Sequence, residues 1–82
     1  MRGMQEGVMS TEYKYLRCEK DKRNGLYYCV AEVRDVGRNF SSGWCETRIA
    51  CDAVDGDSAA VCDVKAKAAM HAHYDPSAVE IP

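Results

Sequence analysis

Two histidines and an aspartate near the end of the chain, in the run His71-Ala72-His73 followed by Asp75, are the residue types best suited to metal binding. Residues two positions apart on a helix point roughly 200° away from each other, so these imidazoles cannot bind one ion from a regular helix. Protonated histidines are favourable at the negative C-terminal end of a helix. We therefore expect capping or solvent-exposed histidines and no metal site.

Cysteine with histidine is the minimum for a thiol nucleophile, which needs a thiolate of lowered pKa and a general base within hydrogen-bond distance. Cys62 is the best placed cysteine, because it falls near the start of a predicted helix, where the dipole favours a thiolate. Asp55, Asp57 and Asp63 lie close to it in sequence and oppose that effect. We expect no catalytic residue, no enzyme and no cofactor.

The acidic segment that includes Asp52, Asp55, Asp57 and Asp63 is the remaining candidate cation site. It lacks the D-x-D-x-D-G spacing and the closing glutamate of a calcium loop. We interpret it as a solvated turn that leads into the residues that begin a helix.

Five cysteines, Cys18, Cys29, Cys45, Cys51 and Cys62, form no C-x-x-C pair and no zinc-knuckle spacing. Their odd number, and a start without the apolar segment of a signal peptide, favour a reducing compartment in which cysteine is a small buried apolar residue. We therefore expect a cytoplasmic protein. The alternative is an oxidised domain with one thiol left over, whose disulfide pairing the sequence does not determine.

The composition predicts one small domain with a thin core. The chain has 82 residues and a net charge of −2, and only 13 residues are Leu, Ile, Val or Phe. A domain of this size buries only about 60% of its unfolded surface, so a partner surface, a homodimer or disulfides would each support it. No apolar stretch approaches the roughly 18 residues of a membrane span.

A β-hairpin is predicted around Asn24-Gly25, since both central positions of a type I′ turn require positive φ. The strands are expected at 13–23 and 26–36, with facing positions that sum to 49. This register pairs Leu16 with Val33 and Cys18 with Ala31 on an apolar core face. It pairs Tyr15 with Arg34 and Arg17 with Glu32 on the opposite face.

A third strand is predicted over 44–51, where residues alternate again, and a helix from Ala59 to about Tyr74, ended by Asp75-Pro76. We expect the helix arc that carries Val61 and Val64 to pack on the sheet, and the arc that carries Ala66 and Met70 to face a second copy or the C-terminal tail. The fold class is therefore α+β, a three-stranded antiparallel β-meander followed by one C-terminal helix on one face. The domain spans 12–76, between a flexible N-terminal tail at 1–11 and a C-terminal tail at 77–82.

The sheet face opposite the helix is the predicted partner-binding surface. Tyrosine, tryptophan and arginine are enriched at binding hot spots because each buries a large area and keeps a polar group. The expected binding residues are Tyr13, Tyr15, Arg17, Tyr28, Arg34, Trp44 and Arg48. Glutamates on the same face would repel phosphates, which favours a protein partner over nucleic acid, and no membrane partner is expected.

The predicted β-β-β-α order, with Val64-Lys65-Ala66-Lys67-Ala68-Ala69-Met70 in its helix, resembles the second half of a double-stranded-RNA-binding domain. The first helix of that family is missing, and the start of this helix is acidic. The resemblance covers about residues 26–73 and implies a shared topology, without a binding role. The alternative function is nucleic-acid binding through the lysines at 14, 20, 22, 65 and 67. The leading hypothesis is a small protein-binding inhibitor or adaptor that acts sterically, similar in size to phage-encoded inhibitors such as anti-CRISPR proteins.

Overall fold

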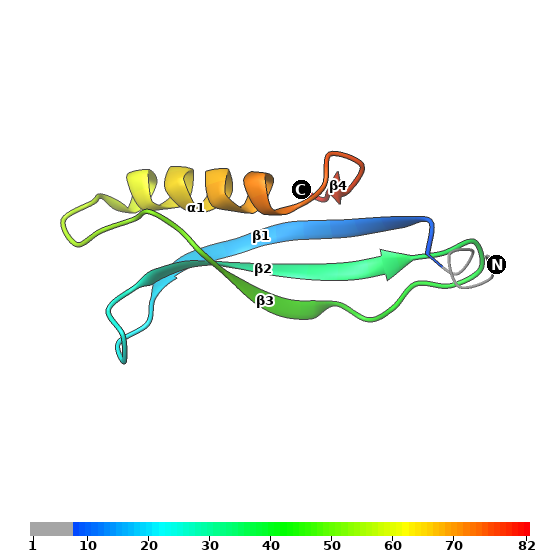
Figure 1. Ribbon diagram of the computed structural model, residues 1–82, viewed down its shortest axis with the longest axis horizontal. Helices are drawn as coiled ribbons and strands as arrows, with labels where there is room; N and C mark the ends of the chain where they lie inside the picture. Colours follow the sequence, from blue (N-terminus) through cyan, green and yellow to red (C-terminus); the bar gives the residue numbers. More distant parts are fainter. Residues whose placement is uncertain (1–7) are drawn as a thin grey trace.

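The structure of the protein, a computed structural model, describes residues 8–82. Its elements are β1 (Ser10–Lys20), β2 (Tyr27–Val36), β3 (Cys45–Ala50), α1 (Ala59–His73) and β4 (Val79–Glu80). The molecule is elongated, about 50 Å long and 20–23 Å across, and α1 lies along one face of the sheet (Figure 1). The end of the sheet that carries the β2–β3 connection projects beyond the helix.

The prediction of a small α+β fold is confirmed, but the sheet has four strands in the order β3-β2-β1-β4. The expected sheet of three antiparallel strands was therefore incomplete, because β4 pairs parallel to β1 at Glu12 and Tyr13. The N–H of Ile81 also donates to the carbonyl of Tyr13 at 2.7 Å. A two-residue strand is too short to show alternation, so its sequence could not be distinguished from a tail.

Most of the predicted N-terminal tail, residues 1–7, lies outside the described residues. Of the remaining residues of that segment, Ser10 and Thr11 form the start of β1 and pair with the end of β2. The first strand therefore begins earlier than the sequence indicated.

The turn between β1 and β2 is longer than the predicted type I′ turn. Only Gly25 has a positive φ, at 76°, whereas a type I′ turn also needs one at Asn24. The loop closes through Asp21, whose N–H donates to Leu26 O and whose carbonyl accepts from Gly25 N, both at 2.8 Å. The side chain of Asn24 accepts from the N–H of Leu26 at 2.9 Å, so it stabilises the loop without adopting the strained backbone.

The strand register also differs from the prediction. Tyr15 pairs with Ala31 and Arg17 pairs with Val30, so a β-bulge at Leu16 interrupts β1. One extra residue reverses which side chains of β1 face the helix. Even-numbered residues after the bulge face the core, as predicted for Cys18, but odd-numbered residues such as Tyr13 face it before the bulge.

The helix forms where it was predicted, with Ser58 as its N-cap accepting from Val61 N. The prediction of which helix arc packs on the sheet is wrong. Val64, from the arc expected to face the sheet, is 68% exposed, whereas Ala66 and Met70, from the other arc, are fully buried. The sheet offers small side chains beneath the helix, Cys29 and Ala31 among them. An alanine-lined helix face can approach such a surface closely, and the long Met70 side chain fills the space that remains.

Candidate functional site

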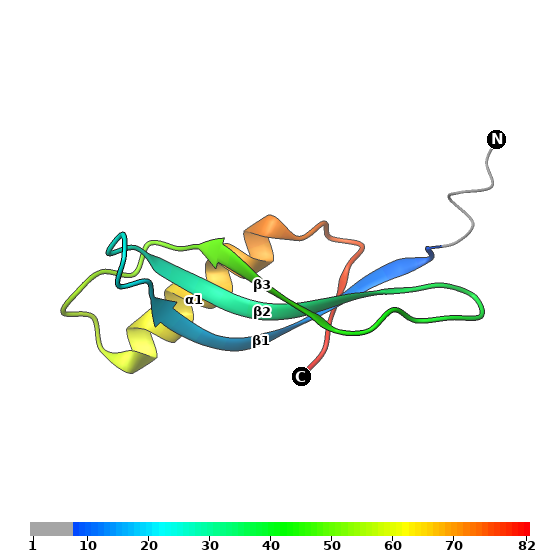
Figure 2. The same ribbon diagram turned by 90° about the horizontal axis from the view of Figure 1, so that it is seen from below.

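The candidate site is the face of the sheet turned away from α1, which we call the open face. Figures 1 and 2 show the helix covering only the opposite face. Strand alternation and the register place these residues on the open face: Glu12, Lys14, Arg17 and Glu19 from β1, Tyr28, Val30, Glu32 and Arg34 from β2, and Trp44, Glu46 and Arg48 at β3. Cross-strand contacts link most of them.

Five of the seven predicted binding residues lie together on the open face, namely Arg17, Tyr28, Arg34, Trp44 and Arg48. For Tyr13 and Tyr15 the predicted placement is wrong, because the bulge at Leu16 turns both toward the helix. Tyr13 is only 7% exposed, and its ring stacks on that of Tyr74 with centroids 4.3 Å apart. The two tyrosines contribute to the core and not to the open face.

The hydroxyl of Tyr15 donates to a carboxylate oxygen of Asp63 on the helix at 2.5 Å. The ammonium of Lys67 lies 5.1 Å from the centroid of the same ring. Burial, followed by the hydrogen bond to Asp63, raises the pKa of Tyr15 above its ordinary value. This tyrosine fixes the helix to the sheet.

Trp44 is the centre of the open face. Its half-buried ring lies 4.6 Å from the Arg34 guanidinium and 5.0 Å from the Lys14 ammonium, measured to the ring centroid. Arg34 is in turn held by Glu12, whose Oε1 accepts from Nε at 2.8 Å and lies 2.7 Å from the terminal nitrogen. Lys14 pairs with Glu32 at 3.7 Å. The indole is therefore fixed by cations that carboxylates hold in place.

A second contact crosses the middle strand. A terminal nitrogen of Arg17 on β1 lies 3.6 Å from Oε2 of Glu46 on β3, and its Nε donates to Glu19 at 2.8 Å. Between them, on β2, Val30 has no exposed surface although it lies on the face without a helix. The stem of Arg17 covers this valine, so the open face has a small apolar centre of its own.

Arg48 and Tyr28 form the third contact, with the guanidinium 4.5 Å from the ring centroid. The Tyr28 hydroxyl accepts from the side-chain amide of Asn24 at 3.1 Å, and Arg48 reaches Asp21 at 3.5 Å. The pKa of Asp21 is lowered first by the backbone N–H of Arg23, with smaller contributions from the side chains of Arg23 and Arg48. This end of the open face is anchored to the hairpin loop.

Glu12 and Lys14 were not among the residues expected on this face. In the predicted register, where facing positions sum to 49, Glu12 would face Gly37 and Lys14 would face Asp35. The observed pairing puts Glu12 opposite Arg34 and Lys14 opposite Glu32. Exposed apolar residues, Met9 and Phe40, were also missed. Both lie at the end of the sheet near Trp44, since Met9 N–H donates to Val36 O and Gly37 N–H donates to Phe40 O.

The charges of the open face balance. The cations Lys14, Arg17, Arg34 and Arg48 match in number the anions Glu12, Glu19, Glu32 and Glu46. Elsewhere, Lys20 pairs with Asp55 at 3.0 Å and Lys65 with Asp57 at 2.9 Å. The hydrogen bond from Tyr27, followed by the contact with Lys20, lowers the pKa of Asp55. The hydrogen bond from Lys65 lowers the pKa of Asp57. Few lysines are left to bind phosphates.

Four cysteines meet between the sheet and the helix, Cys18 from β1, Cys29 from β2, Cys51 after β3 and Cys62 from α1. All are free thiols, as is the exposed Cys45. Burial, followed by the thiols of Cys51 and Cys62, raises the pKa of Cys18 to about 12. Burial and Cys51 raise the pKa of Cys29 to about 11. Protonated thiols are poor nucleophiles, so Cys18 and Cys29 act as core residues.

The histidines lie at the opposite end of the helix from Cys62. His71 lies nine positions after Cys62, which corresponds to about 14 Å along the helix at 1.5 Å per residue. His71 Nε2 is 2.7 Å from Glu80 Oε1, and the His73 ring lies edge-on to Tyr74. No cysteine–histidine pair can therefore form along α1. Within residues 8–82, no group of three or more His, Cys, Asp or Glu side chains is arranged to hold a metal ion.

No protein-family model matches the chain, and neither a curated protein nor a solved structure shows significant similarity to it. Across the described part of the chain, no helix is long and apolar enough to cross a membrane. The function is therefore argued from the side chains of the open face.

Proposed function

We propose that the protein is a small, non-enzymatic interaction module that places the open face of its sheet on a protein partner and acts sterically, as an inhibitor or adaptor. The observation that supports this most directly is the fixed position of Trp44 beside Arg34 and Lys14. An aromatic side chain that is already held in place loses little conformational entropy when a partner covers it. Tryptophan and arginine are also the residue types most enriched at binding hot spots.

The charges of the open face support a protein partner. Alternating cations and anions around Trp44 and Tyr28 have the composition of a polar rim around aromatic anchors. A neutral surface of this kind offers no net attraction to a polyanion. Its charge pattern instead favours a partner whose charges are complementary.

Nucleic-acid binding is the alternative, and the ion pairs of Lys14, Lys20 and Lys65 count against it. A salt titration separates the two functions. Phosphate contacts make the affinity fall steeply with salt concentration, whereas an aromatic protein interface responds weakly.

Quantitative capture from a lysate of the expressing cells tests the proposal. Immobilised wild-type protein is compared with the variants Trp44→Ala and Arg34→Ala. Leu26→Ala and Arg23→Ala in the β1–β2 loop are matched controls, since they remove an exposed apolar and an exposed cationic side chain. We expect the two open-face variants to lose most of the captured partner and the two controls to retain it. Undiminished capture by Trp44→Ala would show that the open face is not the partner-binding site.

A cytoplasmic location is part of the proposal. All five cysteines are free thiols. Four of them lie between the sheet and the helix, where a free cysteine acts as a small apolar residue. Free thiols of this kind are typical of proteins in a reducing compartment. Intact mass of freshly purified protein, with and without reductant, tests this location. A loss of about 2 Da per disulfide before reduction would contradict it.

A further inference from the structure

The strand β3 has one edge without a partner. In the sheet order β3-β2-β1-β4, β3 pairs with β2 alone, and no element among residues 8–82 pairs with its other edge. Figure 2 shows β3 on the outside of the sheet. The opposite edge differs, because β4 covers β1 at Glu12 and Tyr13 and the bulge at Leu16 interrupts the rest of that edge. Unpaired backbone groups on an exposed edge are a template for pairing with another strand.

The direction of the backbone groups of β3 follows from one hydrogen bond. Cys51 N–H donates to Tyr27 O at 3.1 Å, so residues 51 and 27 form a hydrogen-bonded pair of the antiparallel ladder. Hydrogen-bonded pairs recur every second residue, so Thr47 directs its N–H and C=O toward β2. Glu46 and Arg48 therefore direct theirs outward, to the free edge.

These constraints select one symmetric pairing with a second copy. If two β3 strands pair antiparallel about Thr47, Glu46 of each copy lies opposite Arg48 of the other, and each such pair exchanges both of its hydrogen bonds. The oppositely charged side chains then face each other on the open face. Moving the axis by one residue in either direction places Arg48 opposite Arg48, or Glu46 opposite Glu46, which is repulsive.

The edge is free to pair. The β2–β3 register is continuous, without a bulge, and β3 contains no proline to block a ladder. Glu46 lies 3.6 Å from Arg17, and Arg48 lies 3.5 Å from Asp21 and 4.5 Å from the Tyr28 ring centroid. Both charged groups are therefore already held on the open face beside the free edge, where those of a second copy can join them.

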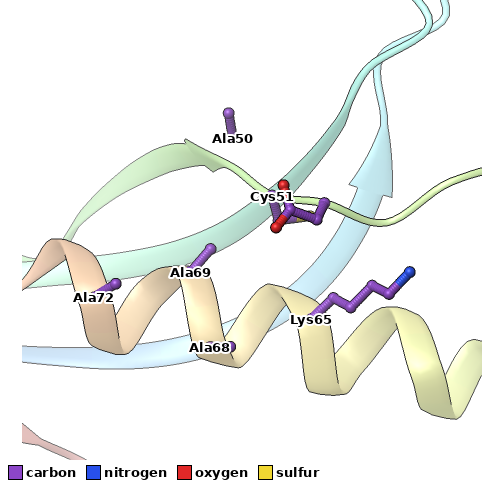
Figure 3. A pocket seen from close by; sticks show the side chains of 7 residues that line it. Ala50, Cys51, Lys65, Ala68, Ala69 and Ala72 are labelled. Carbon is purple, nitrogen blue, oxygen red and sulfur yellow. The ribbon is translucent and has the colours of Figure 1, made fainter.

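A shallow groove of about 260 Å³ lies between α1 and the end of β3. It is lined mainly by alanine, and Figure 3 shows Ala68, Ala69 and Ala72 on the helix below Ala50 and Cys51. The C-terminal half of α1 crosses behind β3 and projects past it in Figure 2. Strand pairing about an axis perpendicular to the sheet keeps both helices on one face, so these apolar surfaces add to the contact.

We propose that the free edge of β3 is a self-association site, at which a second copy of this chain pairs antiparallel about Thr47 to form one continuous sheet. The backbone edge of β3 is distinct from the open face, although the side chains of Glu46 and Arg48 contribute to both. It places the open faces of both copies side by side, so a dimer presents two binding surfaces in one direction.

Charge exchange tests the register. The molar mass in solution is measured by light scattering behind size exclusion for wild type, Glu46→Arg, Arg48→Glu, and the double variant. Wild type is expected to be a dimer. Each single variant should have a dimer dissociation constant about tenfold higher or more, because both Glu46–Arg48 contacts between the copies become repulsive. An equimolar mixture of the two single variants should recover the dimer, as should the double variant. Circular dichroism confirms that each variant is folded.

A wild type that stays monomeric at several hundred micromolar would overturn the proposal. Single variants that dimerise like wild type would also overturn it, since the interface would then lie elsewhere. Thr47→Cys gives an independent result, because facing residues of a non-hydrogen-bonded pair have Cα atoms about 4.5 Å apart, within disulfide range. This variant should form a disulfide-linked dimer under mild oxidation. Wild type should not, since the exposed Cys45 lies opposite Ile49 of the second copy and not opposite Cys45.

Discussion

The guanidinium of Arg17 on β1 reaches across the middle strand to Glu46 on β3, with 3.6 Å between the two groups, and the register sets the stem of Arg17 opposite the buried Val30. This contact ties together three strands on the face that has no helix. It explains how a domain with so few large apolar residues keeps an open sheet face ordered. The same contact makes the face a preformed surface.

The cover over Val30 depends on the stem of Arg17 more than on its charge. Arg17→Ala should lower the free energy of unfolding by about 1 kcal/mol, because it uncovers a buried valine. Arg17→Met keeps most of the stem, and should lie close to wild type since an exposed ion pair contributes little. Urea unfolding at neutral pH measures both. Equal destabilisation by the two variants would show that the ion pair, not the cover, is what matters.

Trp44 is the only tryptophan, so its fluorescence reports directly on the open face. Arg34→Ala removes the cation 4.6 Å from the ring centroid and should expose the ring, which shifts the emission to longer wavelength and increases quenching by iodide. Arg23→Ala, in the hairpin loop, is the control and should leave the spectrum unchanged. An unchanged spectrum for Arg34→Ala would mean that the two side chains do not pack together in solution.

Among residues 8–82, Met70 is the largest fully buried side chain. Met70→Ala should lower the free energy of unfolding by about 2–5 kcal/mol, because it leaves a cavity between the helix and the sheet. A small domain has little more stability than this, so the variant should be largely unfolded at 37 °C. Val64→Ala on the exposed side of the same helix should change the stability by less than about 0.5 kcal/mol. Circular dichroism during thermal unfolding distinguishes them, and the reverse order would exclude this orientation of the helix.

Stability should fall at alkaline pH. The pKa of Cys18 is raised from 9.0 to about 12, that of Cys29 to about 11, and that of Tyr27 from 10.0 to about 12. Between about pH 9 and pH 12 the folded state therefore keeps protons that the unfolded chain releases, so the free energy of unfolding decreases as pH rises. The contribution of these groups is complete below pH 9.

Urea unfolding at several pH values from 7.5 to 11 checks this dependence. Cys29→Ala should flatten the decline in stability, because it removes a group that titrates differently in the two states. The exposed Cys45→Ser is the matched control and should follow wild type. A stability that stays constant up to pH 11 would contradict the burial of these thiols.

The sequence predicted the elements better than the way they pack. Strong local signals placed the helix that follows Ser58 and the third strand, and they are confirmed within a residue or two. The bulge at Leu16 has no local signal, because alternation on either side of it is regular, yet it decides which tyrosines are buried. Five binding candidates on β2, β3 and the second half of β1 share a face since no bulge separates them.

The helix orientation could not be read from hydrophobicity alone. Valine is more apolar than alanine, so the arc that carries Val61 and Val64 was expected to face the sheet, but both are exposed. Packing selects shape as well as hydrophobicity, and the arc with Ala66 lets the helix come close to a sheet of small side chains. Such complementarity depends on both surfaces at once, and one segment of sequence shows only one of them.

Site-specific photo-crosslinking tests the central claim, that the open face contacts the partner, most directly. A photoreactive phenylalanine derivative replaces Tyr28 on the open face in one variant, where it keeps an aromatic ring, and Val64 on the exposed side of the helix in another. Each variant is irradiated in the cell lysate. We expect a crosslinked protein adduct from position 28, competed away by unlabelled wild type and not by Trp44→Ala, and none from position 64. A competed adduct from position 64 alone would place the partner on the helix side and contradict the account.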